Sequence, residues 1–191
     1  PQGLYDPRFE HDACGIGFIV DLAGRKSHAL VRDAVQILLN LEHRGACGCE
    51  KNTGDGAGIL TQGPHRFLAK ECDRLGIRLP QERGYGVAMV FLPTDANDRA
   101  ACEKMFEDVV TAEGQKVLGW RTVPTDNRPL GPTAIKGQPV IRQLFIGRDP
   151  NIAEDQAFER KLFVVRRRAE NTVRASGLAQ KDMFYVPSLS H

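Results

Sequence analysis

The chain has 191 residues, of which 41% are hydrophobic and 26% are charged, and its formal net charge is +2. These values describe a globular domain large enough to bury one core, so a single domain is the default expectation. A net charge this small gives no reason to expect nucleic acid or an acidic membrane surface as a partner. No apolar run approaches the roughly 18 residues of a membrane-spanning helix. We therefore expect a protein that binds neither.

The first thirteen residues form a segment unlike the rest of the chain. Residues 1–13 contain two prolines, a glycine, several charged side chains and His11, with no helical or alternating pattern. We therefore predict a detachable leader. The segment lacks the apolar centre of a secretory signal and the acid-poor, Arg- and Ser-rich make-up of a transit peptide. It is not an export signal by these criteria, and we expect a cytoplasmic protein.

Cys14 follows this leader, in an apolar, β-branched run over 13–20 that predicts a strand. Two glycines in the run let other groups approach the backbone closely. A buried free cysteine is more often a small hydrophobic residue than a nucleophile. Loss of residues 1–13 would change this, because the nitrogen of Cys14 would become a free α-amine with a pKa of about 7.7 to 8. Such an amine can activate a thiol whose own pKa is about 8.5, so we predict Cys14 as an N-terminal nucleophile.

The cysteines are odd in number and irregularly spaced, which argues against a disulfide framework and is typical of a reducing compartment. They are Cys14, Cys47, Cys49, Cys72 and Cys102. Cys47 and Cys49 form a Cys-x-Cys pair with no second pair or histidine array to complete a zinc or iron–sulfur site. We therefore predict no metal site.

Apolar residues at spacings of three and four predict an amphipathic helix over 28–43 that stops at Gly45. Arg44 stands in its last turn, where an arginine is commonly a partner of the helix dipole or a solvated charge. The glycine-rich segment 52–58 lacks the lysine and Ser/Thr of a phosphate-binding loop, and it leads into an expected short strand over 59–61. We predict a tight turn there and not a phosphate site.

The remaining helices and strands alternate along the chain. Periodicity predicts helices over 64–75, 95–114 and 153–175, and strands over 85–92, 117–123, 140–146 and 184–190. The strand over 85–92 is almost continuously apolar, which indicates burial on both faces. The helix residues expected to face the core are Ala101, Met105, Val109, Ala112, Phe158, Leu162, Val165 and Ala169. The loop before residue 140 is expected to be exposed, and the arginines of the last helix to form a solvated face or a contact with another domain.

Five motifs stand in order along the chain: Cys14–Phe18, Leu41–Ala46, Asn52–Gly58, Leu118–Arg121 and Phe184–Ser190. Together they resemble the start of the glutamine amidotransferase domain of the glutamate synthase family. The leader is similar to the short propeptide of that family, and the resemblance covers essentially the whole chain. It implies that residues 1–13 are a propeptide and that 14–191 form the N-terminal part of a class II amidotransferase domain.

Pattern alone indicates a mixed α/β protein and does not decide how its sheets stack. The resemblance implies an α+β fold, the four-layer αββα sandwich of the N-terminal nucleophile hydrolases, incomplete at the C-terminal end. It also implies that Arg44 lies beside Cys14, which it orients and supports electrostatically. The expected catalytic residues are therefore Cys14 and Arg44, and neither a cofactor nor a metal is expected in this segment.

The reaction implied by the resemblance is hydrolysis of L-glutamine. Cys14 would attack the side-chain amide, ammonia would leave, and water would resolve the thioester to glutamate. The ammonia would pass to a synthase domain carrying FMN and an iron–sulfur cluster, where it would convert 2-oxoglutarate to glutamate. The expected partners are L-glutamine, the rest of the large subunit and, as an open choice, a small subunit.

Two further motifs of the family have no match in the chain. They are a His-x-Arg that holds the glutamine α-carboxylate and an Asn-Gly of the oxyanion hole. We therefore expect this chain, with its leader attached, to be an inactive unprocessed form. Three alternatives stay open: the amidotransferase domain of another class II enzyme, a non-catalytic fragment whose Cys14 is never freed, and a small-ligand module that uses the loop 54–58.

Overall fold

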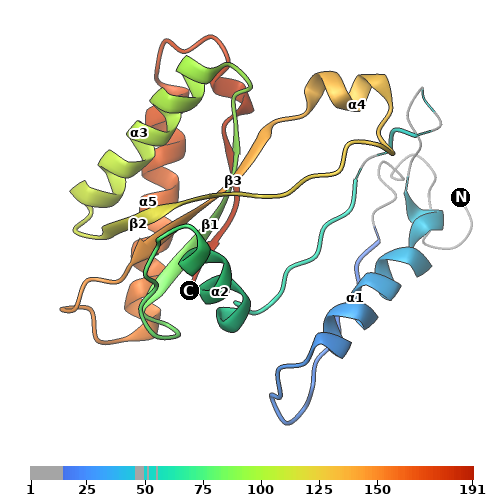
Figure 1. The fold of residues 1–191 in the computed structure, drawn as a ribbon, viewed down its shortest axis with the longest axis horizontal. Helices are drawn as coiled ribbons and strands as arrows, with labels where there is room; N and C mark the ends of the chain where they lie inside the picture. Colours follow the sequence, from blue (N-terminus) through green and yellow to red (C-terminus); the bar gives the residue numbers. More distant parts are fainter. Residues whose placement is uncertain (1–14, 46–49, 51, 55) are drawn as a thin grey trace, which may run out of the picture. The chain divides into compact units, whose positions relative to one another are not determined.

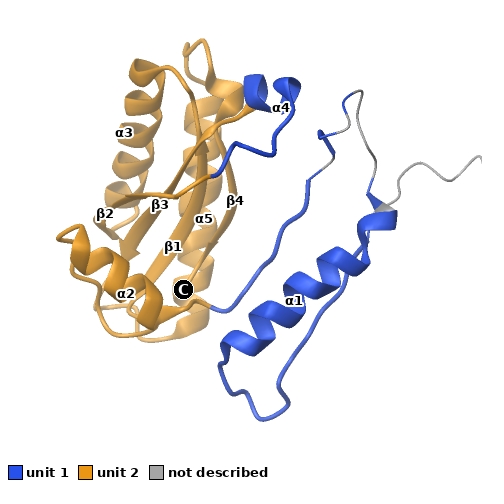
Figure 2. Ribbon diagram, turned by 45° about the vertical axis from the view of Figure 1, so that its right-hand side comes forward, with its two compact units in different colours: residues 1–62, 126–137 blue, residues 63–125, 138–191 orange. Residues whose placement is uncertain are grey.

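A computed structural model describes residues 15–45, 50, 52–54 and 56–191, with the backbone alone for Arg44. The chain divides into two compact units (Figure 2). Unit 1 comprises residues 1–62 and 126–137, and unit 2 comprises residues 63–125 and 138–191. Each unit is built from its own helices, and the strands belong to unit 2.

Unit 2 is organised around an antiparallel sheet of four strands (Figure 1). They are β1 (Tyr85–Leu92), β2 (Lys116–Thr122), β3 (Val140–Gly147) and β4 (Tyr185–Ser190), in the order β2-β3-β1-β4. All four strand predictions are confirmed to within one residue at each end. Pro187 of β4 stands where the pairing with β1 changes register, because proline cannot donate a hydrogen bond to the ladder.

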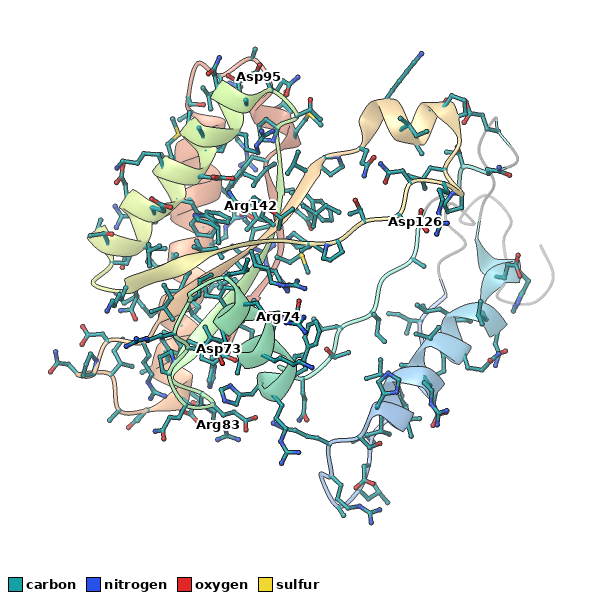
Figure 3. All side chains as sticks on the ribbon, in the orientation of Figure 1. Asp73, Arg74, Arg83, Asp95, Asp126 and Arg142 are labelled. Carbon is teal, nitrogen blue, oxygen red and sulfur yellow. The ribbon has the colours of Figure 1, made fainter. Side chains whose placement is uncertain are left out.

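Two helices, α3 (Ala96–Ala112) and α5 (Asp155–Arg174), pack on one face of this sheet (Figure 1). The side chains of α5 that enter this core are those that its spacing predicts: Phe158, Leu162, Val165 and Ala169, followed by Val173. They meet Ala88, Val90 and Leu92 of β1 in the larger of two hydrophobic clusters. The carboxylate of Asp95 caps α3 by accepting hydrogen bonds from the amides of Asn97 and Asp98 at 2.9 Å each (Figure 3).

The buried face of α3 is rotated from the predicted one. Cys102, Phe106, Val109 and Val110 are buried, whereas Ala112 is exposed. The Phe106 ring packs edge-on against two aromatic rings, with centroids 6.0 to 6.2 Å apart. The predicted face contained alanines, whose side chains bury little apolar area. Burial of the Phe106 ring removes more apolar area from water, so the face that carries it turns towards the core.

The opposite face of the sheet is covered in part by α2 (His65–Arg74). Leu68 and Cys72 of this helix are buried against Tyr85 and Phe145 in the smaller cluster. The β1 side chains on this face alternate with the fully buried ones and are only half-buried apart from Tyr85. The prediction that β1 is buried on both faces is therefore confirmed for the α3/α5 face and wrong for much of the other. α2 ends before Gly76, whose φ of +71° is a helix-stop conformation that glycine adopts without strain.

The motif Leu118–Arg121 joins β2 to the helices on both faces of the sheet. The Trp120 indole donates a hydrogen bond to Glu107 of α3 at 2.7 Å, and the guanidinium of Arg142 lies 5.2 Å from its ring centroid (Figure 3). Arg121 is 7% exposed and donates to Glu71 of α2 at 3.2 Å. This motif, one of the five behind the resemblance, therefore serves packing in unit 2.

Unit 1 contains α1 (His28–Asn40), a single 3₁₀ turn η2 (Glu42–Arg44) and the short helix α4 (Pro132–Gly137). The predicted start of α1 is confirmed, and Ser27 caps it by accepting a hydrogen bond from the amide of Leu30 at 3.4 Å. The segment before residue 140 was predicted as an irregular loop and contains α4, so that prediction is wrong in part.

The strands predicted over 13–20 and 59–61 are not formed where the structure describes the chain, at 15–20 and 59–61. A strand exists only by pairing with a neighbour, and an apolar run cannot show whether a neighbour is in reach. The described residues hold one sheet, so the four-layer αββα arrangement stays a prediction. No helix within the described ranges is long and apolar enough to cross a bilayer.

Candidate active site

The two residues predicted to carry the chemistry stand at the borders of what the structure describes. Cys14 lies outside the described residues, and so does the side chain of Arg44. The structure describes the chain that follows Cys14 and the backbone that leads to Arg44, and both segments belong to unit 1.

The segment 15–20 lies directly against α1. A Cβ atom on Gly17 would stand 2.4 Å from Cγ2 of Ile37, so only glycine fits this contact. After the segment the chain reverses through a turn in which Oδ1 of Asp21 accepts hydrogen bonds from the amides of Ala23 at 2.8 Å and Arg25 at 3.2 Å. Gly24 completes the turn with a φ of +69°. The segment and α1 therefore run in opposite directions.

Within the described residues, Gly17 lies beside the C-terminal half of α1, the half that leads to the backbone of Arg44. From Ile37 to Leu41 the helix advances about 6 Å, at about 1.5 Å per residue. From Gly17 back to Gly15 an extended chain covers about 6.6 Å in the same direction. Gly15 and the turn that contains the backbone of Arg44 consequently lie towards the same end of the helix.

The backbone at this end of α1 is held by local hydrogen bonds. The amide of Leu41 donates to the carbonyls of Ile37 and Leu38 at 3.1 Å each, which closes the helix. The ring nitrogen Nδ1 of His43 donates to the carbonyl of Asn40 at 3.0 Å, and the amide of Gly45 donates to the carbonyl of Glu42 at 3.0 Å. These bonds fix the backbone of Arg44 at the end of α1.

A second cluster in unit 1 joins the loop after this turn to α4. The Glu50 carboxylate accepts hydrogen bonds from Thr53 Oγ1 at 2.8 Å and from the amide of Thr133 at 3.1 Å to one oxygen and 3.2 Å to the other. It also accepts from Thr133 Oγ1 at 2.5 Å. These hydrogen bonds, those of Thr133 Oγ1 and then Thr53 Oγ1 foremost, lower the pKa of Glu50. We call Glu50, Thr53, Gly131 and Thr133 the Glu50 clasp.

Sequence reasoning missed the clasp because its halves are 83 residues apart. One local signal was present. Gly131-Pro132 is the order in which a chain often enters a helix, since proline tolerates the first helical position, and it would have suggested α4. Nothing in the pattern indicated that a distant carboxylate would cap that helix.

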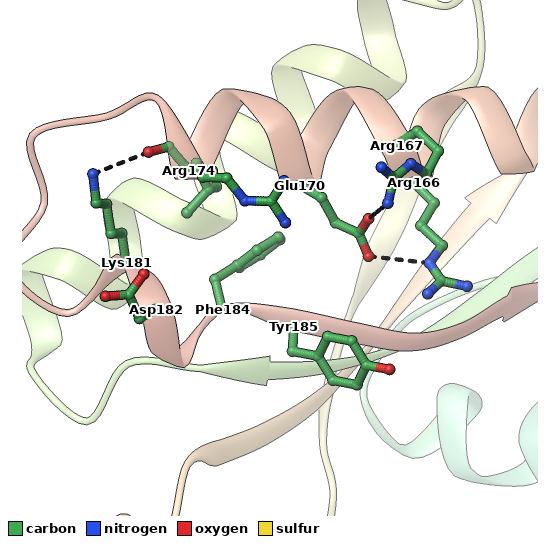
Figure 4. Close-up of a pocket in the computed structure, with 9 residues that line it drawn as sticks. Arg166, Arg167, Glu170, Arg174, Lys181, Asp182, Phe184 and Tyr185 are labelled. Atoms are coloured by element: carbon green, nitrogen blue, oxygen red, sulfur yellow. Dashed lines mark hydrogen bonds and ion pairs between the residues drawn. The ribbon is translucent and has the colours of Figure 1, made fainter.

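Unit 2 contains a shallow polar pocket of about 350 Å³ at the C-terminal end of α5 (Figure 4). Its cationic side chains are Arg166, Arg167, Arg174 and Lys181. Glu170, which is 8% exposed, accepts from Arg166 Nε at 3.1 Å and from Arg167 at 2.7 Å, so two of the four cations are paired. The basic face predicted for this helix is thus in part neutralised internally.

Two thiols of unit 2 are unsuited to nucleophilic chemistry. Cys72 and Cys102 are free and fully buried, and burial raises the pKa of each to about 11. Cys47 and Cys49 lie outside the described residues. Among the residues that are described, no three His, Cys, Asp or Glu side chains gather as a metal site would require.

Comparison with protein families decides the class of the domain. The family model "Glutamine amidotransferases class-II" matches residues 14–191. The chain belongs to the class-II glutamine amidotransferases. The match to this amidotransferase family begins at Cys14, the residue that the sequence singled out as the nucleophile.

Curated relatives of this amidotransferase domain are glutamate synthases. The glutamate synthase (NADPH) large chain of Bacillus subtilis is 46% identical over 189 residues, which cover 99% of this chain and 12% of that protein. The glutamate synthase (NADH) of Schizosaccharomyces pombe is 37% identical, with 98% and 9% covered. The ferredoxin-dependent glutamate synthase of Pyropia yezoensis is 36% identical, with 95% and 12% covered. The amidotransferase chain thus spans about a tenth of the length of these relatives.

Proposed function

We propose that this domain supplies ammonia to a glutamate synthase by hydrolysing L-glutamine. The observation that carries the proposal is the identity of 46% to a glutamate synthase large chain over nearly the whole domain. Membership of the class-II amidotransferases gives the reaction type, and the relatives give the destination of the ammonia. The rival destination, another class II enzyme, has no comparable support among the relatives described above.

The chemistry follows from an N-terminal cysteine. The α-amine of Cys14 takes the thiol proton, and the sulfur attacks the carbon of the glutamine side-chain amide. The tetrahedral intermediate collapses to a thioester, and the amide nitrogen leaves as ammonia after it receives that proton. Water then attacks the thioester and releases glutamate and the free thiol. Arg44, whose backbone lies at the end of α1, orients and electrostatically supports the sulfur.

This mechanism requires Cys14 to be released from Ala13. While the peptide bond to Ala13 is intact, the nitrogen of Cys14 is an amide and cannot accept a proton. We propose that residues 1–13 are a propeptide and that the unprocessed form is inactive. We also propose the four-layer αββα sandwich for the complete domain, with the antiparallel sheet of unit 2 as one of its sheets and α3 with α5 as one helical layer.

The remaining partners belong to the whole protein. We propose that a synthase domain carrying FMN and an iron–sulfur cluster consumes the ammonia together with 2-oxoglutarate, and that a small subunit joins the large one. We propose a cytoplasmic location, in keeping with two cysteines that are free and not joined in a disulfide.

The decisive experiment compares Cys14→Ser with wild type in the full-length protein that contains this domain. Glutamine hydrolysis should fall at least about 100-fold, because a hydroxyl is hardly ionised at neutral pH, while glutamate formation from added ammonia should persist. The N-terminus of the active protein, measured by mass spectrometry, should be Cys14. The matched control is Cys72→Ser, which changes a buried thiol and should keep its turnover per folded molecule.

Two results would contradict the proposal. Glutamine hydrolysis by Cys14→Ser within tenfold of wild type would remove this thiol from the mechanism. Full activity in a protein in which Ala13 is still bonded to Cys14 would exclude the N-terminal amine as the base.

A further inference from the structure

We propose that Glu50 is a positioning residue of the amidotransferase site, which it serves by fastening residues 52–54 to the first turn of α4. The inference rests on the proposed function and adds a structural element to it. The segment 126–137, which the sequence presents as an exposed connection, becomes part of the support of the active site.

The first argument is the number and direction of the hydrogen bonds. Both oxygens of the Glu50 carboxylate accept hydrogen bonds, and the donors come from both sides of the junction: Thr53 on the loop and Thr133 on α4. The amide of Thr53 also donates to the carbonyl of Glu50 at 3.1 Å, which closes the loop on itself. A carboxylate that accepts from several neutral donors is held ionised and in place.

The second argument is steric. Gly131 is buried, and a Cβ atom built on it would stand 2.3 Å from Oε2 of Glu50 and 2.4 Å from Oγ1 of Thr53. The backbone of Gly131 and the carboxylate of Glu50 therefore pack so closely that no side chain at residue 131 would fit between them. The clasp depends on glycine at this position as much as on the carboxylate.

The third argument is the lack of any other strong attachment for α4. None of the side chains of Pro132–Gly137 is buried, so hydrophobic packing does not hold this helix. A six-residue helix is also too short to be stable alone. The polar contacts of Glu50 with its first turn are therefore the main attachment of α4 to the rest of unit 1 that the described residues show.

The clasp is close to the predicted chemistry along the chain. Glu50 follows Arg44 by six residues, a length that spans at most about 20 Å. Loss of the clasp would release residues 52–54 from α4, and we expect the resulting displacement to alter how substrate is held without removing any reacting group. A displacement of about 1 Å can cost about 100-fold in rate.

The experiment uses full-length protein and measures KM and kcat for glutamine, the ammonia-dependent reaction, and the fraction of thiol that a glutamine-analogue label titrates. Glu50→Ala should raise KM for glutamine at least about fivefold, with kcat calculated per titrated site. It should leave the ammonia-dependent rate within twofold. Gly131→Ala should act in the same direction. Thr133→Val should give a smaller rise in KM, because the amide of residue 133 still donates. Thr133→Ser keeps the hydroxyl and should retain the wild-type KM and kcat.

The matched control is Asp126→Asn, which lies in the same segment (Figure 3) and pairs with Arg128 at the surface and not with the loop. It should leave KM and kcat unchanged. A Glu50→Ala protein with the wild-type KM for glutamine would overturn the inference, whether its titratable fraction is full or reduced. A purely structural role would change only the fraction of molecules with a titratable thiol.

Failure of the proposed function would be distinct. Wild-type protein that processes Cys14 but does not hydrolyse glutamine would contradict the amidotransferase activity and, with it, the role given to Glu50. Amide exchange at Thr133 would then still report whether the clasp exists, by protection in wild type and its loss in Glu50→Ala.

Discussion

Gly17→Ala is the substitution that tests most directly whether α1 positions the nucleophile. The new methyl carbon would stand 2.4 Å from Cγ2 of Ile37, whereas two carbons in contact are about 3.5 to 4.0 Å apart. One partner must therefore move by at least about 1 Å. Ile37 stands on a regular helix, whereas residues 15–20 are in no strand, so the segment that follows Cys14 is the part that yields.

The expected effects on stability and on turnover differ in size. Overpacking costs about 1 to 3 kcal/mol in a tight core and less here, because Ile37 is only half-buried. A displacement of about 1 Å of the chain next to Cys14 should instead lower glutamine turnover by about 100-fold. Ammonia-dependent glutamate formation, which does not need the thiol, should be unchanged.

The assay is a double-mutant cycle with Ile37→Ala, which removes the colliding methyl group. The double variant should recover at least tenfold of the lost turnover, while Ile37→Ala alone should change it little. Gly63→Ala is the matched control, because a Cβ there meets nothing within 4 Å. Turnover of Gly17→Ala within twofold of wild type, or a loss that Ile37→Ala does not restore, would refute the reasoning.

Three further predictions concern single groups. Arg44→Lys should lower glutamine turnover about tenfold or more with an unchanged melting temperature, because an ammonium cannot replace a planar fork of donors; equal turnover would return Arg44 to a helix-end role. Cys72 and Cys102, whose pKa burial raises to about 11, should resist iodoacetamide at neutral pH in native protein and react after unfolding, as peptide mass spectrometry would show. A hydrogen bond from Lys161 foremost lowers the pKa of Glu113, so the stability it contributes is present above the ordinary glutamate pKa and lost as pH falls through the lowered one. Glu113→Gln should therefore lower the melting temperature near neutral pH and reduce its fall between about pH 5 and about pH 2, and an unchanged acid limb would contradict this.

Local chemistry along the chain was enough to predict most of unit 2. An apolar run such as Tyr85–Leu92 is too short for a helix and too apolar for the surface, so its assignment as a strand needs no knowledge of its neighbours. The inward face of α5 follows from spacing alone, since its large apolar residues repeat at three and four. The end of α2 at Gly76 follows from the conformational freedom of one residue.

The candidate nucleophile was also predicted from the sequence alone. Cys14 was chosen because an N-terminal cysteine carries its own base, and its role as the nucleophile stays a prediction. Whether Arg44 lies beside it stays a prediction.

Only the tertiary structure decided the contacts between residues far apart in the chain. No local pattern shows that Glu50 caps a helix 83 residues later, because a carboxylate chooses its donors by proximity and not by sequence distance. The rotation of α3 depended on the rings that Phe106 meets, Trp120 of β2 and Phe184 just before β4. The runs at 15–20 and 59–61 have the composition of strands but no partner in the described structure, and a backbone ladder, unlike a helix, cannot be completed within its own segment.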